Sequence, residues 1–380
     1  MPILQTIPLS LYIHIPWCVK KCPYCDFNSH AALKTIPEQD YTTALLKELE
    51  SYLPYAANRP LVSIFFGGGT PSLFHAKTIE TILHGISKFF SLENIEITLE
   101  ANPGTIDQDR FRGLYIAGIN RLSIGIQSFQ ARFLKSLGRI HDDKQAVKAV
   151  EAAYHGGFKN INLDLMYGLP HQSLDDALFD LETALSFQTT HLSWYQLTIE
   201  PNTFFHHTPP TLPSDDHIWQ MQIAGQSCLK KAGLKQYEVS AYARPHQYCR
   251  HNDNYWTFGD YLGIGAGAHS KITTEKGECI RFSQVKHPKD YLNIENRKIP
   301  SIKLLSEQDL IFEFMLNALR LTDGVPVTLF TERTGLPMER INNILSEAMK
   351  MKLLKNSMTH IQPTNHGKRY LNNLIQLFLN

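Results

Sequence analysis

Three cysteines lie close together near the start of the chain. Cys18, Cys22 and Cys25 are separated by three and by two residues, so one loop can turn three sulfur atoms around one centre. Three thiolates suit a cubic [4Fe-4S] cluster that leaves one iron without a protein ligand, because such clusters ordinarily take four cysteines. A structural zinc site needs a fourth ligand, usually from a second pair of Cys or His residues, and no such pair has that spacing here. The spacing favours an iron-sulfur cluster; zinc, or three reduced thiols packed by chance, remain alternatives.

The elements that must position this loop follow from hydrophobic periodicity. Short, nearly continuous apolar runs alternate with longer amphipathic segments, and continuous apolar strands suit a parallel sheet buried on both faces. The pattern predicts an α/β fold, a partial (β/α)6 TIM-like barrel, with a doubly wound open sheet as the alternative because periodicity does not report closure. Strands are predicted at 11–15, 61–66, 95–99, 121–126, 161–166 and 192–197, and helices at 41–53, 76–90, 144–155, 174–186 and 217–232.

Polar residues gather where several of these strands end. They lie at 67–70, 100–103, 127–128 and 167–170, each at or just past the carboxyl end of a predicted strand. Barrel enzymes collect their sites at this rim, which favours the barrel over the open sheet.

The pattern changes after about residue 270. Helices are predicted at 307–321, 327–334 and 338–350, followed by a hairpin at 352–361. We predict two domains, a barrel domain at 1–285 and a small helical, winged-helix-like domain at 300–380. A winged helix often binds DNA, but 37 Lys and Arg residues against 36 Asp and Glu residues give a net charge of only +1. This balance favours a packing or lid role and no nucleic-acid partner.

Composition also bears on location. The 43% hydrophobic content is that of a soluble globular protein, the start MPILQT does not resemble a secretion signal, and no apolar run approaches the roughly 20 residues that span a bilayer. We expect a cytoplasmic protein, whose clustered cysteines are metal ligands or catalysts rather than disulfides. Peripheral contact with a membrane is left open.

The cysteine spacing resembles the signature of the radical S-adenosylmethionine (SAM) family, and further segments resemble oxygen-independent coproporphyrinogen III oxidase and its homologues. The resemblance implies a partial barrel in which SAM chelates the open iron and is cleaved to a radical. The similar segments are 12–18, 66–72, 100–103, 123–129, 137–139 and 164–170.

The same resemblance implies roles for individual residues. Cys18, Cys22 and Cys25 would hold the cluster, and His14, on the same strand face as Tyr12, would be catalytic in the barrel interior. The glycines after the second strand would expose backbone for close approach to SAM. The implied cofactor-binding residues are Tyr12, Tyr24, Gly68, Gly69, Thr70, Glu100, Gln127, Arg139, Asp164 and His269.

Two functions share this scaffold in the family, decarboxylation of coproporphyrinogen III to protoporphyrinogen IX and binding and transfer of heme. The decarboxylase usually has a fourth cysteine two positions after the third, where this chain has Phe27. It also has an N-terminal extension, whereas the first strand here is expected near residue 10. His251-Asn252-Asp253-Asn254-Tyr255-Trp256 matches the HNxxYW signature of the heme chaperones.

That motif makes chemical sense for heme. Histidine is a common axial ligand of heme iron, and aromatic faces stack on a flat macrocycle. His251, Asn252, Tyr255 and Trp256 are therefore predicted to bind heme, with Cys249 as an alternative thiolate ligand and a buried core histidine as the structural alternative.

We predict a heme chaperone, with coproporphyrinogen III decarboxylation as the alternative and enzymatic activity left open. The implied partners are heme and heme-accepting proteins, membrane-bound respiratory ones among them. A homodimer is left open.

Overall fold

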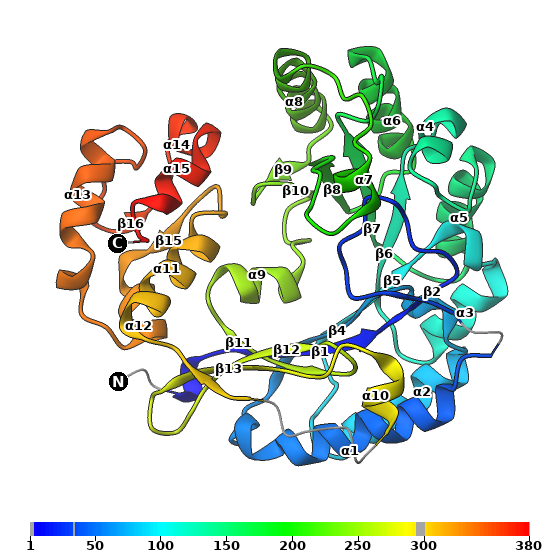
Figure 1. The fold of residues 1–380 in the computed structure, drawn as a ribbon, viewed down its shortest axis with the longest axis horizontal. Coiled ribbons are helices and arrows are strands. Elements are labelled where there is room, and N and C mark those ends of the chain that lie inside the picture. The colour runs from blue at the N-terminus through cyan, green and yellow to red at the C-terminus, as the bar shows by residue number, and fades with distance from the viewer. Residues whose placement is uncertain (1–3, 33–34, 294–300, 380) are drawn as a thin grey trace.

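The centre of the fold is one twelve-stranded sheet (Figure 1). The computed structural model describes residues 4–32, 35–293 and 301–379. Seven neighbouring strands run parallel, and from β1 to β8 each of the six barrel strands lies beside the next one along the chain. The parallel strands, in spatial order, are β11 (Asp260–Ile264), β1 (Leu9–Ile15), β4 (Leu61–Gly68), β5 (Glu96–Ala101), β6 (Arg121–Gln127), β7 (Asn160–Tyr167) and β8 (His191–Gln196).

Helices cover the convex side of this curved sheet (Figure 1). A doubly wound sheet would carry helices on both faces, so the predicted partial barrel is confirmed and the open-sheet alternative is wrong. Capping boxes at Asp142 and Ser173 begin α5 and α6. The helices are α1 (Glu38–Ala56), α2 (Ala76–Ser87), α3 (Gln108–Ile116), α5 (Asp143–His155), α6 (Leu174–Ser186) and α8 (Asp215–Lys231).

The first strand shows how one sequence serves both faces of the sheet. Leu9, Leu11 and Ile13 are buried in the core between sheet and helices. The alternate residues Ser10 and Tyr12 point to the concave interior, because successive side chains of a strand face opposite ways. Ser10 Oγ lies 2.8 Å from Oγ of Ser63, its register partner on the neighbouring strand β4.

Antiparallel strands extend the sheet at both edges, and the sequence did not predict them. They are very short or lie in a segment without helical units between them. These strands are β9 (Lys235–Gln236), β10 (Ala241–Ala243), β12 (His269–Thr273), β13 (Cys279–Ser283) and β14 (Lys303–Leu304). Among the described residues, no strand pairs with the outer side of the edge strands β14 and β9, so the described sheet does not close on itself.

The last part of the chain has a hydrophobic core of its own, to which Phe314, Phe330 and Leu374 belong. It lies at the left of Figure 1, across α9 from the parallel strands. The predicted hairpin is only partly present: His360–Ile361 pairs with Val325–Pro326, while Leu354 and Pro363 form a single bridge. The elements are α11 (Glu307–Ala318), β15 (Val325–Pro326), α12 (Val327–Thr334), α13 (Asn342–Lys350), β16 (His360–Ile361), α14 (Asn365–Arg369) and α15 (Leu371–Gln376).

The predicted domain limits at residues 1, 300 and 380 lie outside the described residues, and the two-domain division stays a prediction. The remaining short elements are η1 (Leu4–Thr6), β2 (Trp17–Cys18), β3 (His30–Ala31), η2 (Pro71–Leu73), η3 (Pro103–Thr105), α4 (Ala131–Ser136), α7 (Phe204–His207), α9 (Arg250–Trp256), α10 (Pro288–Leu292) and η4 (Met338–Arg340).

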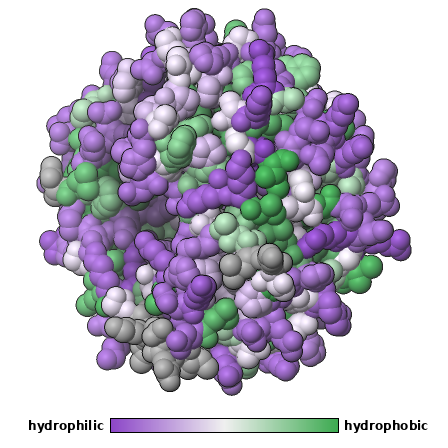
Figure 2. Space-filling model, turned by 45° about the vertical axis from the view of Figure 1, so that its right-hand side comes forward, coloured by the Kyte–Doolittle hydropathy of each residue, from purple (hydrophilic) through white to green (hydrophobic). Residues whose placement is uncertain are grey.

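The surface is mixed in character. Figure 2 shows a mainly hydrophilic face with small separate hydrophobic patches and a hydrophilic hollow. Among the described helices, none has the length and apolar character needed to cross a membrane.

Candidate functional site

The cysteine loop leaves the barrel at the carboxyl end of β1. The short pair β2 and β3 closes its base, where the His30 amide donates to the Pro16 carbonyl and the Ala32 amide to the Cys18 carbonyl, both at 2.7 Å. The Asn28 side chain ties the loop to the rest of the rim, because its Nδ2 donates to the carbonyls of Ala266 at 3.0 Å and Lys286 at 2.9 Å. The loop is therefore held at both its base and its side.

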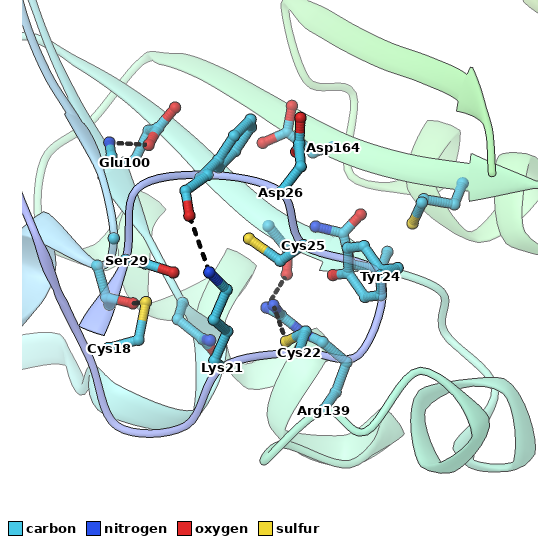
Figure 3. Close-up of a pocket in the computed structure, with 18 of the residues that line it drawn as sticks. Cys18, Lys21, Cys22, Tyr24, Cys25, Asp26, Ser29, Glu100, Arg139 and Asp164 are labelled. Atoms are coloured by element: carbon cyan, nitrogen blue, oxygen red, sulfur yellow. Dashed lines mark hydrogen bonds between the residues drawn. The ribbon is translucent and has the colours of Figure 1, made fainter. Parts of the chain in front are cut away.

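The three thiols line a cavity of about 420 Å³, which we call the cysteine cavity (Figure 3). The Thr70 hydroxyl donates to Cys18 Sγ at 3.4 Å, and Arg139 Nη1 donates to Cys22 Sγ at 3.7 Å. Burial raises the pKa of the Cys18 and Cys25 thiols, so thiolates here require a positive partner such as iron. Donors already aimed at two sulfur atoms fit a loop that carries thiolate ligands.

The sulfur atoms surround a space rather than a point. Among the described residues, no group of three His, Cys, Asp or Glu side chains is arranged to hold a single metal ion. Three thiols spread around one cavity fit the separate corners of a [4Fe-4S] cluster.

Two half-buried carboxyl groups face the cysteine cavity from the barrel strands. Glu100 Oε2 accepts from the Gly68 amide at 3.2 Å, and Asp164 accepts from the Ser123 hydroxyl at 2.9 Å and the Asn162 amide at 2.8 Å. Burial, and then the charge of Asp164, raise the pKa of Glu100 to about 8. Burial also raises the pKa of Asp164. Two carboxyl groups in one cavity suit a cationic ligand.

The glycine turn after β4 is needed for close packing. A Cβ on Gly68, whose φ is 111°, would lie 2.5 Å from His14 Cε1, and a Cβ on Gly69 would lie 2.6 Å from the Trp17 carbonyl oxygen. These glycines let the turn pass against the protein's own ring and cysteine loop, while the Gly68 amide remains at the cavity. The predicted reason, close approach to SAM, is thus only part of the explanation.

Gln127 and Arg139 form another wall of the cysteine cavity. Gln127 adopts a φ of 69°, a conformation that non-glycine residues rarely hold, and its Oε1 accepts from the Tyr195 hydroxyl at 2.8 Å. Arg139 Nη2 donates to the Gly125 carbonyl at 2.6 Å, which fixes the guanidinium beside the thiols. Tyr24, on the cysteine loop, lines the same cavity, and burial raises its pKa.

Tyr12, His14 and His269 do not line the cysteine cavity. They line an adjacent cavity of about 530 Å³, which we call the histidine cavity. It shares part of its lining with the cysteine cavity, namely Lys21, Asp26, Phe27, Ser29, Gly68 and Glu100. Its charged and aromatic lining includes Tyr12, His14, Lys21, Phe27, His30, Tyr255, His269 and Lys286.

His14 was expected to be catalytic, but both of its ring nitrogens are engaged in hydrogen bonds. Its Nδ1 accepts from the Tyr12 hydroxyl at 3.0 Å, and its Nε2 donates to the Asn28 carbonyl at 2.8 Å. With burial as the main cause, its pKa is lowered, which favours the neutral ring that this pattern needs. The structure makes His14 a bridge between β1 and the cysteine loop.

His251 lies on α9, which packs against β1, β4 and β11 on the concave side of the sheet (Figure 1). The residue is 2% exposed, its Nδ1 lies 2.9 Å from the Ser63 hydroxyl, and its ring stacks on Phe65 with centroids 4.8 Å apart. Burial, and then Arg121, lower the pKa of His251 to about 3. Within the described part of the chain, its Nε2 has no hydrogen-bond partner.

A third cavity, of about 240 Å³, lies beside His251, and we call it the inner cavity. Asn252 and Tyr255 of the same helix line it, and Tyr255 also lines the histidine cavity. The structure brings His251, Asn252 and Tyr255 to one cavity, and their role in heme binding stays a prediction.

Trp256 and Cys249 depart from the prediction. Trp256 lines none of the three cavities; its ring packs against the C-terminal core, with the Arg320 guanidinium 4.3 Å from the ring centroid. Consecutive helix residues face different sides, so Trp256 points away from these cavities, and its expected stacking on a macrocycle stays a prediction. Cys249 Sγ donates to Glu96 Oε1 at 3.6 Å in a fully buried position, and burial raises its thiol pKa to about 12, which disfavours a thiolate ligand.

Some cavity residues were missed although a signal was available. Side chains two apart on a strand share a face, so Asp164 on β7 implied that Asn162 lies on the cavity side. The same alternation on β8 gives Ser193 and Tyr195, which line the cysteine cavity. Lys286 had no such signal, since it lies beyond an unpredicted strand.

The barrel and the cysteine loop together define a radical SAM type of domain. The model of the Radical SAM superfamily matches residues 12–184, and the HemN C-terminal domain model matches residues 305–370. A solved structure, coproporphyrinogen III oxidase (HemN) from Escherichia coli, described as a radical SAM enzyme, is similar with a TM-score of 0.82. It is 24% identical and the match covers 98% of this chain and 90% of that chain, so it shows the shared fold.

Full-length relatives are more similar still. A protein named heme chaperone HemW from Haemophilus influenzae is 51% identical over 98% of both chains, and one from Escherichia coli is 48% identical over 98% of both. Another from Bacillus subtilis is 32% identical over 97% of this chain and 99% of its own length. The chain belongs to the HemW family within the radical SAM superfamily.

Proposed function

We propose that this chain is a heme chaperone, which binds heme and passes it to acceptor proteins on a radical SAM scaffold. The observation that carries this proposal is α9 on the concave side of the barrel. It brings His251, with a free Nε2, and Tyr255 to cavities beside the cysteine loop. The relatives named heme chaperone HemW support it over the full chain length.

Cys18, Cys22 and Cys25 are the proposed ligands of a [4Fe-4S] cluster. When bound, the cluster supplies one-electron chemistry at an iron that has no protein ligand. The chain itself orients the thiols through Thr70 and Arg139, which donate to two of the sulfur atoms.

SAM is the proposed ligand of the remaining space in the cysteine cavity. Its ammonium and sulfonium are cationic, and Glu100 and Asp164 face that cavity as half-buried carboxyl groups. Arg139 and the Gly68 amide offer donors for its carboxylate and hydroxyl groups. Gln127 and Tyr195 close the wall beside them.

The proposed acceptors are heme-binding proteins, including membrane-bound respiratory ones, which a cytoplasmic chain would reach by peripheral contact with the membrane. Incubation of the heme-loaded chain with vesicles that carry an apo-acceptor, followed by sedimentation, tests this. We expect heme to move to the vesicle pellet; heme retained by the chain would contradict transfer. The elution volume of the same samples on a sizing column tests whether the chain forms a homodimer.

Coproporphyrinogen III decarboxylation is the second candidate function, favoured by a cavity that suits SAM. The deciding experiment reconstitutes the cluster anaerobically in the full chain. One portion is titrated with heme, and another is incubated with coproporphyrinogen III, SAM and a reductant. We expect saturable heme binding without protoporphyrinogen IX; robust formation of that product contradicts the chaperone proposal.

A further inference from the structure

We propose that heme occupies the histidine cavity, with His269 as the ligand of its iron and Lys21 and Lys286 facing its propionates. This inference rests on the proposed function. It places heme in a different cavity from the inner cavity beside His251. Four observations carry it: cavity size, the state of each histidine, charge and the aromatic lining.

Size separates the three cavities. Sites for ligands of drug size occupy roughly 300–1,000 Å³. The histidine cavity, at about 530 Å³, falls within this range, and the inner cavity, at about 240 Å³, falls below it. The cysteine cavity is already taken by the proposed cluster and SAM. Of these three cavities, the histidine cavity is therefore the one that remains for a macrocycle.

Only one of the histidines that line this cavity has an uncommitted ring. His14 uses both ring nitrogens, and His30 Nε2 lies 3.3 Å from Asn28 Oδ1 while its ring packs edge-on against His287. His269, the first residue of β12, is exposed, and no described residue hydrogen-bonds to its ring. Partial burial, followed by the charges of Arg281 and Lys286, lowers the pKa of His269, which favours the neutral imidazole that binds iron.

The charges around the cavity suit an anionic ligand. Lys21 and Lys286 line it, and only Asp26 opposes them with an ordinary acidic side chain. The Lys286 ammonium has no ion-pair partner among the described residues, and Lys21 Nζ donates only to the Phe27 carbonyl, at 3.1 Å. Glu100 also lines the cavity, but its carboxyl is mostly protonated at pH 7 because its pKa is about 8, so it adds little negative charge. Two ammonium groups thus match the two propionates of heme.

Aromatic side chains from two elements line the same cavity. Phe27 of the cysteine loop is 58% exposed, and Tyr255 of α9 lies inside the barrel. Flat aromatic faces and a flat macrocycle associate well. His251 touches Tyr255 edge to face, with centroids 4.9 Å apart, so His251 is a positioning residue that acts through Tyr255.

The test titrates the purified, cluster-reconstituted full chain with ferric heme and records the Soret band and the electron paramagnetic resonance of the iron. We expect His269→Gly to lose the histidine-ligated spectrum, and added imidazole to restore it by filling the vacated position. The matched control is His84→Ala, an exposed histidine on α2 outside the cavity. A His269→Gly spectrum identical to that of the parent chain overturns the assignment.

His251→Ala in the same titration separates the two candidate ligands. We expect weaker heme binding with an unchanged ligand spectrum, because His251 supports Tyr255. Loss of the ligand spectrum in His251→Ala, with retention in His269→Gly, would move the iron to the inner cavity. Absence of heme binding by the parent chain would instead contradict the proposed function itself, so the two failures are distinguishable.

Lys286→Gln tests the placement of the propionates. We expect heme affinity to fall by about fivefold or less, the size usual for one partly exposed ion pair. The same substitution should have no effect on binding of the dimethyl ester of heme, which lacks the charges. An equal loss for heme and ester would show that Lys286 does not face a propionate.

Discussion

At the scale of single residues, the site depends on where charge is buried. The thiols of Cys18 and Cys25 and the carboxyl of Glu100 have raised pKa values with the same main cause, loss of water around the charged form. Each group is therefore neutral in the cofactor-free chain and gains its charge only when a positive partner binds. Binding and proton release are thereby linked at this site.

Removing the cluster ligands tests the first of these groups. Replacing Cys18, Cys22 and Cys25 by Ala is expected to abolish the visible iron-sulfur absorbance and the bound iron, because no other described thiol lines the cavity. Iron content and visible absorption after anaerobic reconstitution measure this. Cys228→Ala, on α8, is the matched control and should keep both signals. An undiminished iron content in the triple variant would refute the assignment.

The carboxyl of Glu100 makes SAM binding depend on pH. Its folded pKa is about 8 against an ordinary 4.5, so the folded chain binds the extra proton and its stability without SAM falls as pH rises between these values. A cation favours the ionised form, so SAM binding at pH 7 should release a proton. Calorimetry in buffers of different ionisation enthalpy detects that proton.

Glu100→Gln should remove the proton release and weaken SAM binding. Glu200→Gln, at the edge of the same cavity, is the control and should leave the release intact. Equal proton release in the parent chain and in Glu100→Gln would contradict the placement of the SAM cation.

At the scale of elements, α9 links the two hydrophobic cores. One side of this seven-residue helix presents His251 and Tyr255 to the barrel cavities, and the other side presents Trp256 to the C-terminal core. Arg320 lies over the Trp256 ring and also bonds to Glu238 at 3.1 Å. So short a helix depends on such tertiary contacts for its position.

Loss of the contact between Arg320 and Trp256 should disturb the cavities that α9 lines. Arg320→Ala is expected to cost about 0.5–2 kcal/mol of cation–π interaction and to weaken heme binding. Arg369, which lies 4.2 Å from the Trp219 ring centroid, offers a matched pair elsewhere. Arg369→Ala should lose similar stability in urea unfolding without weakening heme binding; equal effects of both variants on heme would contradict a specific link through α9.

The same helix shows what sequence could and could not predict. Apolar runs predicted the six barrel strands because those strands are buried on both faces, and the motif residues His251 and Tyr255 were placed together. Trp256 was expected at the cavities, but a motif gives spacing and not which neighbour each helix face meets. Strands β9, β10 and β14 were missed because each has only two or three residues, and β11, β12 and β13 were missed because no helix separates them. The Lys286 wall of the histidine cavity depends on these strands.

At the scale of the whole molecule, a buried cluster of three charged side chains stabilises one side of the barrel. Asp260 on β11 bonds to Arg59 at 2.7 Å and to Lys271 on β12 at 3.0 Å, and all three side chains are buried. Burial alone would raise the pKa of Asp260, but Lys271 and Arg59 outweigh it and lower the pKa. The cluster joins β11, which lies beside β1, to β12, the next strand toward the edge of the sheet.

Asp260→Ala should destabilise the whole fold, because it leaves the buried cations of Arg59 and Lys271 without their carboxylate partner. The expected loss is about 3–5 kcal/mol in urea unfolding. Since the pKa of Asp260 is lowered, its contribution is present at neutral pH and is lost as pH falls below the usual aspartate range. The control is Asp323→Ala, which removes an exposed pair with Lys235 and should cost less than about 1 kcal/mol. Equal losses would contradict a role for the cluster.

The attachment of the cysteine loop determines what happens to the two cavities when oxygen destroys the cluster. The loop carries the three thiols, and its Phe27 and Lys21 line both the cysteine cavity and the histidine cavity. The pair β2 and β3 and the Asn28 side chain hold the loop through contacts that do not involve the cluster. A cluster lost to air would therefore leave this wall of the histidine cavity in place, and a heme seated there would outlast the cluster.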